Sequence, residues 1–132
     1  MGDRVVVGFR SESWHAKERT LFLYSHWGGS SMRTDLALAL LHAKPRWEDP
    51  DYAMRITISQ LIGEDWMRDT GYGLSVGEYC MPDYDLVPVV NWQRKQVEFY
   101  DSSTYEKQGH ITFNDYIDGH VQLVPVGREM AV

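Results

Sequence analysis

The sequence has 132 residues, with 19 acidic and 13 basic side chains and a formal net charge of −6. This length predicts one domain with a sizeable core, and the charge argues against direct nucleic-acid binding and against attachment to anionic membranes. The lone Cys80 excludes an internal disulfide and a cysteine-based zinc site. No apolar stretch is long enough to span a bilayer, and no apolar signal region is present, so we expect a cytoplasmic protein.

The first half of the chain predicts two strands followed by two helices. Apolar residues alternate in both strand-like segments, and the polar stretch 11–19 between them, with Trp14 and His15, predicts a hairpin loop. Pro45 ends the first helical pattern, and Asp49 is suited to cap the second. The predicted elements are strands over 4–10 and 20–26 and helices over 31–43 and 50–66. The predicted buried stripes are Met32, Leu36, Leu40 and Ala43 in the first helix and Met54, Ile58, Leu61 and Ile62 in the second.

The second half predicts strands, with one short helical turn. The sequence favours a polar loop over 101–109, a helical turn that begins at Ile111 or Thr112, and a final edge strand over 121–126. The predicted strands are 72–79, 86–91 and 96–100. Because helices and strands are segregated, the class is α+β. We expect a mostly antiparallel sheet of about five to six strands with two helices packed on one face.

The junction between the second strand and the first helix is the main candidate site. Gly28, Gly29, Ser30 and Ser31 could cradle a phosphate or carboxylate, because glycine admits close approach and the amides of a first helical turn attract anions. A tight turn with a helix cap would need the same residues. Arg33 opposes the helix dipole in this turn, which a bound anion would offset. The alternative is a solvated side chain or an ion pair with Asp35 or Glu48.

His26 and Trp27 stand at the end of the second predicted strand, beside these glycines. His26 could donate to a ligand oxygen or act as an acid or base, and Trp27 could stack on a planar base. In the alternative interpretation Trp27 fills the junction between sheet and helix, and His26 bonds to a backbone carbonyl.

Two further groups could contribute to binding. Arg46 lies in a corner bounded by prolines, where it could contact a ligand or fix the corner itself. Arg55 lies beside the apolar stripe of the second helix, where its guanidinium could reach an anion or form a surface contact with Asp51 or the Ser59 region. Thr70 and Tyr72 belong to a glycine-rich segment that could place an aromatic ring at the rim of a site or form a plain turn.

Several kinds of chemistry lack their motif. The histidines have no metal-ligand spacing on a helix, and the Gly-x-Ser-x-Gly nucleophile motif is missing. His110 and Thr112 form one His-x-Thr triplet, whereas phosphoesterases of the two-histidine class need two. We therefore expect no metal and no cofactor.

Several segments resemble a group of small uncharacterised proteins encoded by phages of actinobacteria. The segments are 23–29 (LYSHWGG), 46–52 (RWEDPDY), 55–56 (RI), 59–62 (SQLI) and 70–73 (TGYG). The resemblance covers most of residues 20–76 and weakens beyond Glu78. It implies a phage accessory protein, and small proteins of this kind often counter host defence. The resemblance thus implies a phage origin and indicates no mechanism.

The leading hypothesis is a non-catalytic binder that sequesters a nucleotide-like signalling molecule in the bacterial host. One alternative is a phosphodiesterase-type enzyme that uses His26. Another is an acidic inhibitor of a host nuclease or defence effector. Five tryptophans and eight tyrosines are many for this length, which favours a homo-oligomer.

Overall fold

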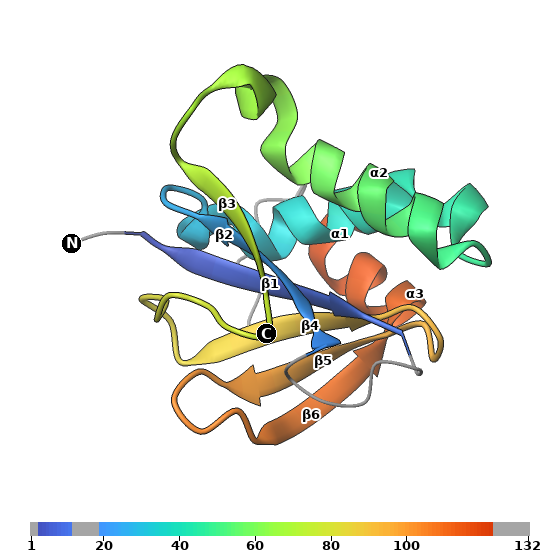
Figure 1. Cartoon of the computed structure of the whole chain (residues 1–132). Coiled ribbons are helices and arrows are strands. Elements are labelled where there is room, and N and C mark those ends of the chain that lie inside the picture. The colour runs from blue at the N-terminus through green and yellow to red at the C-terminus, as the bar shows by residue number, and fades with distance from the viewer. Residues whose placement is uncertain (1–2, 12–18, 123–132) are drawn as a thin grey trace.

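The computed structural model describes residues 3–11 and 19–122, which form one six-stranded sheet with helices on one side (Figure 1). The strand order is β3-β2-β1-β4-β5-β6. The strands are β1 (Val5–Arg10), β2 (Leu21–Ser25), β3 (Tyr72–Val76), β4 (Leu86–Asn91), β5 (Gln96–Asp101) and β6 (Lys107–Thr112). All neighbouring pairs are antiparallel except β1 and β4, which run parallel. The expected α+β class and mostly antiparallel sheet are confirmed.

Two long helices and one short helix cover one face of the sheet (Figure 1). Helix α1 packs on α2, and α3 packs on α1. The α-helices are α1 (Met32–His42), α2 (Pro50–Ile62) and α3 (Phe113–Ile117). Short turns flank them: the 3₁₀ turns η2 (Gly29–Ser31), η3 (Lys44–Arg46) and η4 (Gly63–Met67) and the π-helical turn η5 (Asp118–Gln122). None of these helices is long and apolar enough to cross a membrane.

The main core lies between the sheet and the helices. Its sheet side includes Val7, Phe9 and Leu23, and Trp92 and Phe113 extend it beneath α3. The apolar stripe expected in α1 is confirmed, because Met32, Leu36, Leu40 and Ala43 are all buried. Burying a side chain the size of leucine contributes about 1.5–3 kcal/mol, so this stripe fixes α1 on the sheet.

Helix α2 differs from the prediction in its end and in its buried face. It ends at Ile62 because Gly63 adopts a positive φ of 61°, and a 3₁₀ turn replaces the last predicted helical residues. Its fully buried residues are Ala53 and Thr57, whereas the predicted stripe is only partly buried. Small residues let α2 approach α1 closely, and the Thr57 hydroxyl donates to the Ala53 carbonyl at 2.8 Å.

The second half also departs from the prediction. β3 ends at Val76 rather than at residue 79. The polar loop predicted over 101–109 extends too far, because β6 begins at Lys107 and pairs with β5. The predicted helical turn is confirmed as α3. Of the expected strand over 121–126, the first two residues belong to η5 and the rest lie outside the described residues, as do 12–18 with Trp14 and His15.

The face of the sheet without helices carries a second, smaller core. Val6, Phe22 and Val87 are buried there, together with Val89 and Tyr100. Two tyrosines from connecting segments, Tyr79 and Tyr105, pack onto Phe22 at ring-centroid distances of 4.8 and 6.2 Å. The connections therefore shield the face that the helices leave open.

Candidate ligand-binding groove

The amides at the start of α1 have partners within the chain. Asp3, just before β1, accepts the Gly29 N–H on its carbonyl and the Ser30 N–H on its carboxylate, both at 2.9 Å. The Gly28 N–H donates to the Ser25 hydroxyl at 3.0 Å. An internal carboxylate thus occupies the place where an external anion was expected.

The two glycines at this junction are explained by close packing. A Cβ on Gly29 would lie 2.3 Å from the Tyr84 ring and 2.8 Å from the Asp3 carbonyl oxygen, and one on Gly28 would lie 2.8 Å from the Ser25 hydroxyl. The Tyr84 hydroxyl also bonds to the Asp3 carboxylate. The hydrogen bonds from Tyr84 and from the Ser30 amide lower the pKa of Asp3. A phosphate could use these amides only by displacing Asp3.

Replacing Asp3 with alanine is expected to lower the free energy of unfolding by about 1 kcal/mol, because the Ser30 amide just before α1 and the Tyr84 hydroxyl lose their carboxylate partner. Urea denaturation measures this change. Asp69→Ala is the matched control, since Asp69 is exposed. Equal stability of the two variants would show that the contact with Asp3 contributes nothing.

His26, Trp27 and the segment before β3 form a surface group. The His26 N–H donates to the Gly71 carbonyl at 2.8 Å, its Nδ1 lies 2.9 Å from the Tyr24 hydroxyl, and its ring meets Trp27 edge to face. Trp27 is 51% exposed and lies on Gly71, where a Cβ would lie 2.2 Å from the indole. Thr70 is exposed and Tyr72 is half-buried.

The other predicted arginines lie away from the junction. Gly28 lies before α1 and Arg46 lies beyond its C-terminal end, so the 11-residue helix stands between them. The Arg46 guanidinium lies over the Tyr52 ring at 5.3 Å. Arg55 is exposed and donates to the Ser59 hydroxyl at 3.1 Å, which matches the surface contact considered for it. Neither side chain lines the groove described next.

A groove on the helix side of the sheet brings Arg33 together with aromatic side chains. It consists of two adjoining hollows of about 210 and 80 Å³, which share Arg33, Leu86, Phe99 and Tyr116. We call this the Arg33 groove. Its other lining residues are Val5, Gly29, Met32, Tyr84, Pro88, Ile111 and His120. Helices α1 and α3 form its walls, and β4, β5 and β6 form its floor.

The Arg33 guanidinium has no ion pair within the described residues. The carboxylates expected as alternatives have other partners, because Asp35 accepts from the Ser31 hydroxyl at 2.7 Å and Glu48 pairs with Lys95 at 3.1 Å. Arg33 is exposed, and the Tyr116 hydroxyl donates to its carbonyl at 3.0 Å, which ties α3 to the start of α1. The groove therefore offers an available cation beside a largely apolar floor.

His120 adds a buried polar atom to the lining of the Arg33 groove. The residue is 4% exposed, and its Nδ1 lies 2.8 Å from the Tyr116 carbonyl oxygen. A carbonyl can only accept, so Nδ1 carries the proton and Nε2 of a neutral ring is an acceptor. Nε2 is buried and has no hydrogen-bond partner in the described part of the chain. A ligand N–H or O–H would satisfy it.

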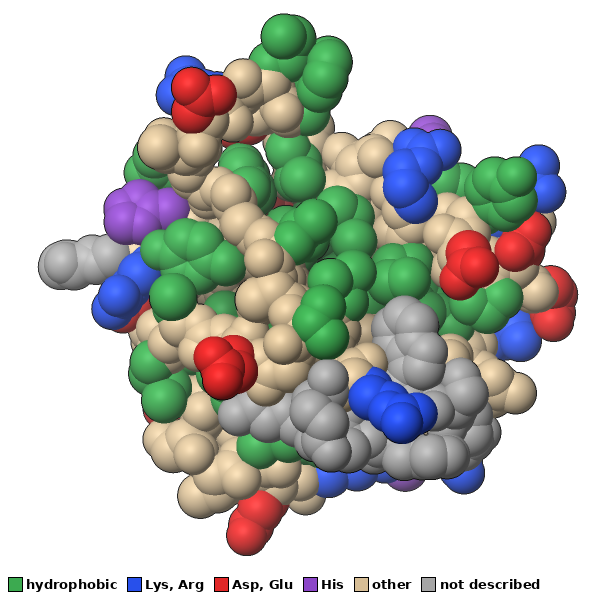
Figure 2. Space-filling model, viewed as in Figure 1, with side chains coloured by type: hydrophobic (Ala, Val, Ile, Leu, Met, Phe, Trp, Pro, Cys, Tyr) green, Lys and Arg blue, Asp and Glu red, His purple; other side chains and the backbone are tan. Residues whose placement is uncertain are grey.

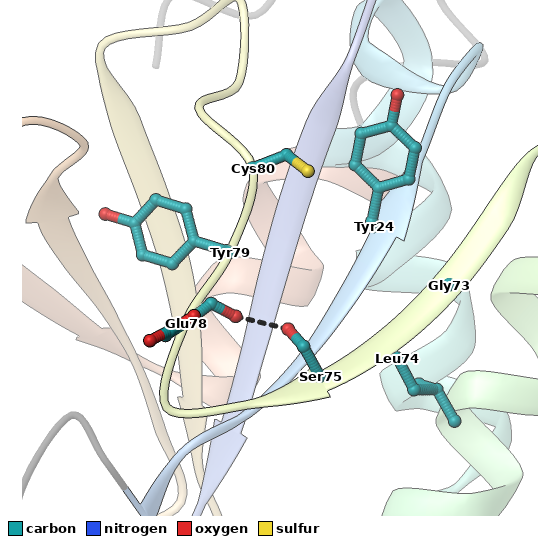
Figure 3. Close-up of a pocket in the computed structure, with 7 residues that line it drawn as sticks. All are labelled: Tyr24, Gly73, Leu74, Ser75, Glu78, Tyr79 and Cys80. Carbon is teal, nitrogen blue, oxygen red and sulfur yellow. Dashed lines mark hydrogen bonds between the residues drawn. The ribbon is translucent and has the colours of Figure 1, made fainter.

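A larger hollow of about 360 Å³ lies on the opposite face of the sheet, between β2–β3 and the connection that follows β3 (Figure 3). Tyr24, Tyr79 and Cys80 line it, and the Ser75 hydroxyl donates to the Glu78 carbonyl. Among the described residues that line it, Glu78 is the one with a charged side chain. Because its described lining holds a carboxylate and no basic side chain, this hollow is less favourable for an anionic ligand than the Arg33 groove, although Tyr24 links it to His26.

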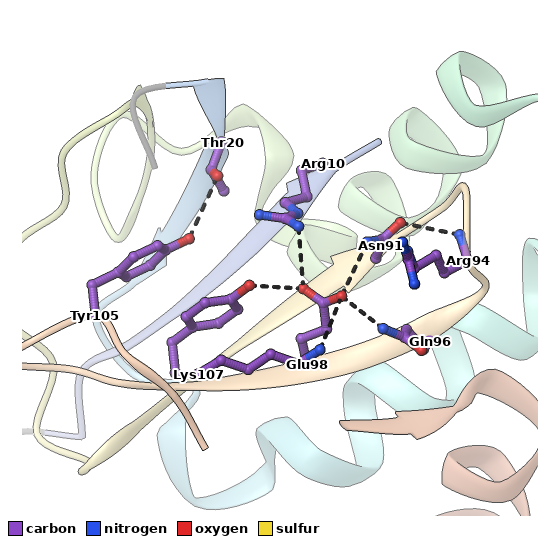
Figure 4. Close-up of polar contacts among 9 residues, drawn as sticks. Arg10, Thr20, Asn91, Arg94, Gln96, Glu98, Tyr105 and Lys107 are labelled. Carbon is purple, nitrogen blue, oxygen red and sulfur yellow. Dashed lines mark hydrogen bonds and ion pairs between the residues drawn. The ribbon is translucent and has the colours of Figure 1, made fainter. Parts of the chain in front are cut away.

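Glu98 is the centre of a polar network on the same face as this larger hollow (Figure 4). Its side chain is 2% exposed and accepts hydrogen bonds from Gln96, Asn91 and Tyr100 at 2.7, 3.0 and 2.9 Å. Arg10 and Lys107 each lie 3.7 Å from its carboxylate. Burial alone would raise the pKa of Glu98, but the hydrogen bonds outweigh it and hold this pKa below its usual range. With both oxygens occupied, the network is structural.

Glu98, Tyr116 and His120 were not among the candidate site residues predicted from the sequence. Glu98 carried a signal, because it is a lone carboxylate between Val97 and Phe99 in a strand, and alternation places it on the other face from these two residues. His120 carried none, since it follows α3 in a short polar turn.

In the described residues no cluster of histidine, cysteine and carboxylate side chains could hold a metal ion. Comparison with known proteins finds no matching family model, no matching curated protein and no matching solved structure.

Proposed function

We propose that the protein binds a small anionic molecule with a planar, nucleobase-like body in the Arg33 groove. The observation that carries the proposal is a guanidinium without an ion pair in the described chain, on the wall of an apolar groove. A charge-assisted hydrogen bond from Arg33 would hold a phosphate or carboxylate, and Phe99 and Ile111 would pack against the planar body.

The dimensions of the groove favour a compact ligand. Its larger hollow holds about 210 Å³, whereas sites for drug-sized molecules span roughly 300–1,000 Å³. A mononucleotide or a cyclic mononucleotide fits this size better than a dinucleotide does. His120 Nε2 would accept from a ribose hydroxyl or an amino group of the base.

The biological role belongs to the same proposal. In the phage setting that the sequence resemblance implies, such a protein would act by sequestering a host signalling molecule, and binding alone would be sufficient. This role calls for tight binding and return of the ligand unchanged.

Calorimetric titration against AMP, GMP, cyclic AMP, cyclic GMP and ADP-ribose tests the proposal. We expect heat with a mononucleotide, and we expect Arg33→Ala to weaken binding about 10- to 100-fold, the effect of losing one charge-assisted hydrogen bond. Arg55→Ala is the matched control, because Arg55 is exposed, donates to the Ser59 hydroxyl on the surface of α2 and does not line the groove.

Two results would contradict the proposal. No heat with any of these nucleotides would refute the ligand class. Equal affinity of the Arg33→Ala variant and the original protein would refute the groove as the site. Recovery of the ligand after heat denaturation separates binding from turnover, because an enzyme would return a product instead.

A further inference from the structure

We infer that two copies of this chain associate through the outer edge of β3, with the two β3 strands antiparallel. β3 is the last strand of the sheet, and no described residue pairs with its outer edge (Figure 1). Such an edge presents a row of free N–H and C=O groups, which a further strand can pair with.

The register of β3 on β2 identifies the free backbone groups. The Gly77 N–H donates to the Thr20 carbonyl, and the His26 N–H donates to the Gly71 carbonyl. Hydrogen bonding alternates along an antiparallel pair, so the odd-numbered residues of β3 bond to β2. Tyr72, Leu74 and Val76 therefore direct their amides and carbonyls away from the sheet.

The side chains along this edge are unusually exposed and apolar. Leu74 and Val76 are 60% and 67% exposed, and Trp66 and Met67 in η4 are 71% and 72% exposed. Trp66 and Leu74 line one hollow of about 280 Å³, and Leu74 points toward the helical side of the sheet (Figure 3). Figure 2, drawn from the same side as Figure 1, shows hydrophobic side chains gathered over η4 and along the middle of this face.

The exposed apolar area along this edge is large enough for a specific interface between two copies. The four side chains present on the order of 500 Å² per copy, so covering them completely in both copies would bury about 1,000 Å², the lower bound for a specific interface. The main-chain hydrogen bonds of the new ladder would add to the stability of this interface.

The two edge strands of the sheet differ in composition. β6 carries Lys107 and His110, and charged side chains on an edge strand oppose its pairing with another chain, whereas residues 72–76 of β3 contain no charge and no proline.

A second copy fits this edge because an antiparallel pair of identical strands has two-fold symmetry. Centred on Leu74, the pairing places Leu74 opposite the partner's Leu74 and Tyr72 opposite the partner's Val76. These are the residues whose backbone groups are free, and their side chains share the helical face.

Cysteine cross-linking tests both the interface and its register. Facing residues in such a pair have Cα atoms about 5.5 Å apart, within the range that a disulfide spans. In a Cys80→Ser background, Leu74→Cys is expected to form a covalent dimer under mild oxidation. Tyr72→Cys faces Val76 rather than itself and is expected to remain uncross-linked, as is Leu41→Cys on α1, which is 42% exposed.

Sedimentation velocity gives the second measurement. We expect the protein to sediment as a dimer at micromolar concentration, Leu74→Lys to sediment as a monomer, and the matched Leu41→Lys variant to remain a dimer. A monomeric original protein, cross-linking of Tyr72→Cys in place of Leu74→Cys, or a dimer that survives Leu74→Lys would each overturn the inference.

Discussion

Replacing Glu98 with alanine is expected to lower the free energy of unfolding by about 3–5 kcal/mol, the range for removing one partner of a buried charge network. The change leaves Asn91, Gln96 and Tyr100 without their acceptor, and it leaves Arg10 without the carboxylate at 3.7 Å. Urea denaturation followed by tryptophan fluorescence measures it. Glu98→Gln keeps the shape and one acceptor, so it should be less damaging.

The control for this variant is Glu106→Ala, since Glu106 is exposed in the turn between β5 and β6. A surface change of this kind is expected to alter stability by no more than about 0.5 kcal/mol. If Glu98→Ala were equally mild, the network would contribute no stability.

The pH dependence of stability provides a second measurement on Glu98. Its pKa is lowered in the folded protein, so it binds fewer protons there than in the unfolded chain. Its contribution is therefore fully present above about pH 5 and is lost as the pH falls through the folded pKa. Glu98→Gln should flatten the acid side of the stability profile. Some slope will remain, because the pKa values of Asp3, Asp83 and Asp101 are also lowered.

Replacing Trp92 with alanine is also expected to destabilise the protein by about 3–5 kcal/mol, the usual effect of removing a buried tryptophan. Trp92 is 1% exposed, and its ring stacks on Phe9 at 6.5 Å and meets Phe113 edge to face at 5.5 Å. It therefore joins β1 to α3 within the main core. Thermal and urea denaturation measure the loss.

Two variants sharpen this result. Trp66→Ala removes the same side chain from an exposed position, and in dilute protein, where association adds nothing, it should change stability little. Trp92→Phe keeps the aromatic contacts and removes an indole N–H that is buried without a partner in the described residues, so it should retain most of the stability. A Trp92→Ala variant as stable as Trp66→Ala would contradict this account of the core.

Hydrophobic periodicity predicted the parts of the fold that one buried face dominates. The spacing of Met32, Leu36 and Leu40 placed α1 correctly, and the alternation of apolar residues placed β1, β2, β4 and β5 to within a residue or two. β6 was missed because its residues other than Ile111 are polar or small, and its place depends on pairing with β5, which is a tertiary interaction. The predicted second helix was too long, because α2 ends where Gly63 takes a positive φ, and the apolar spacing alone does not indicate this end.

The candidate site was less accessible to sequence reasoning. Gly28 and Gly29 do mark a place of close approach, but the approaching groups are Ser25, Asp3 and Tyr84 of the same chain. The glycine and serine pattern predicts that a negatively charged group is favourable at this turn. It does not distinguish a bound anion from a carboxylate of the same chain, which here is Asp3. Arg33 stays a candidate because the fold assigns Asp35 and Glu48 to other partners.

The parallel pairing of β1 with β4 divides the sheet into two antiparallel halves that meet at one seam, from Gly8–Val89 to Arg10–Asn91. Bringing these strands together closes a loop of about 80 residues, at a cost of roughly 4 kcal/mol in chain entropy. The contacts that offset this cost exist only when both halves are in place, since the core beneath the helices draws on β1 and β5 alike. The sheet should therefore form and melt as a single cooperative unit, with neither half persisting alone.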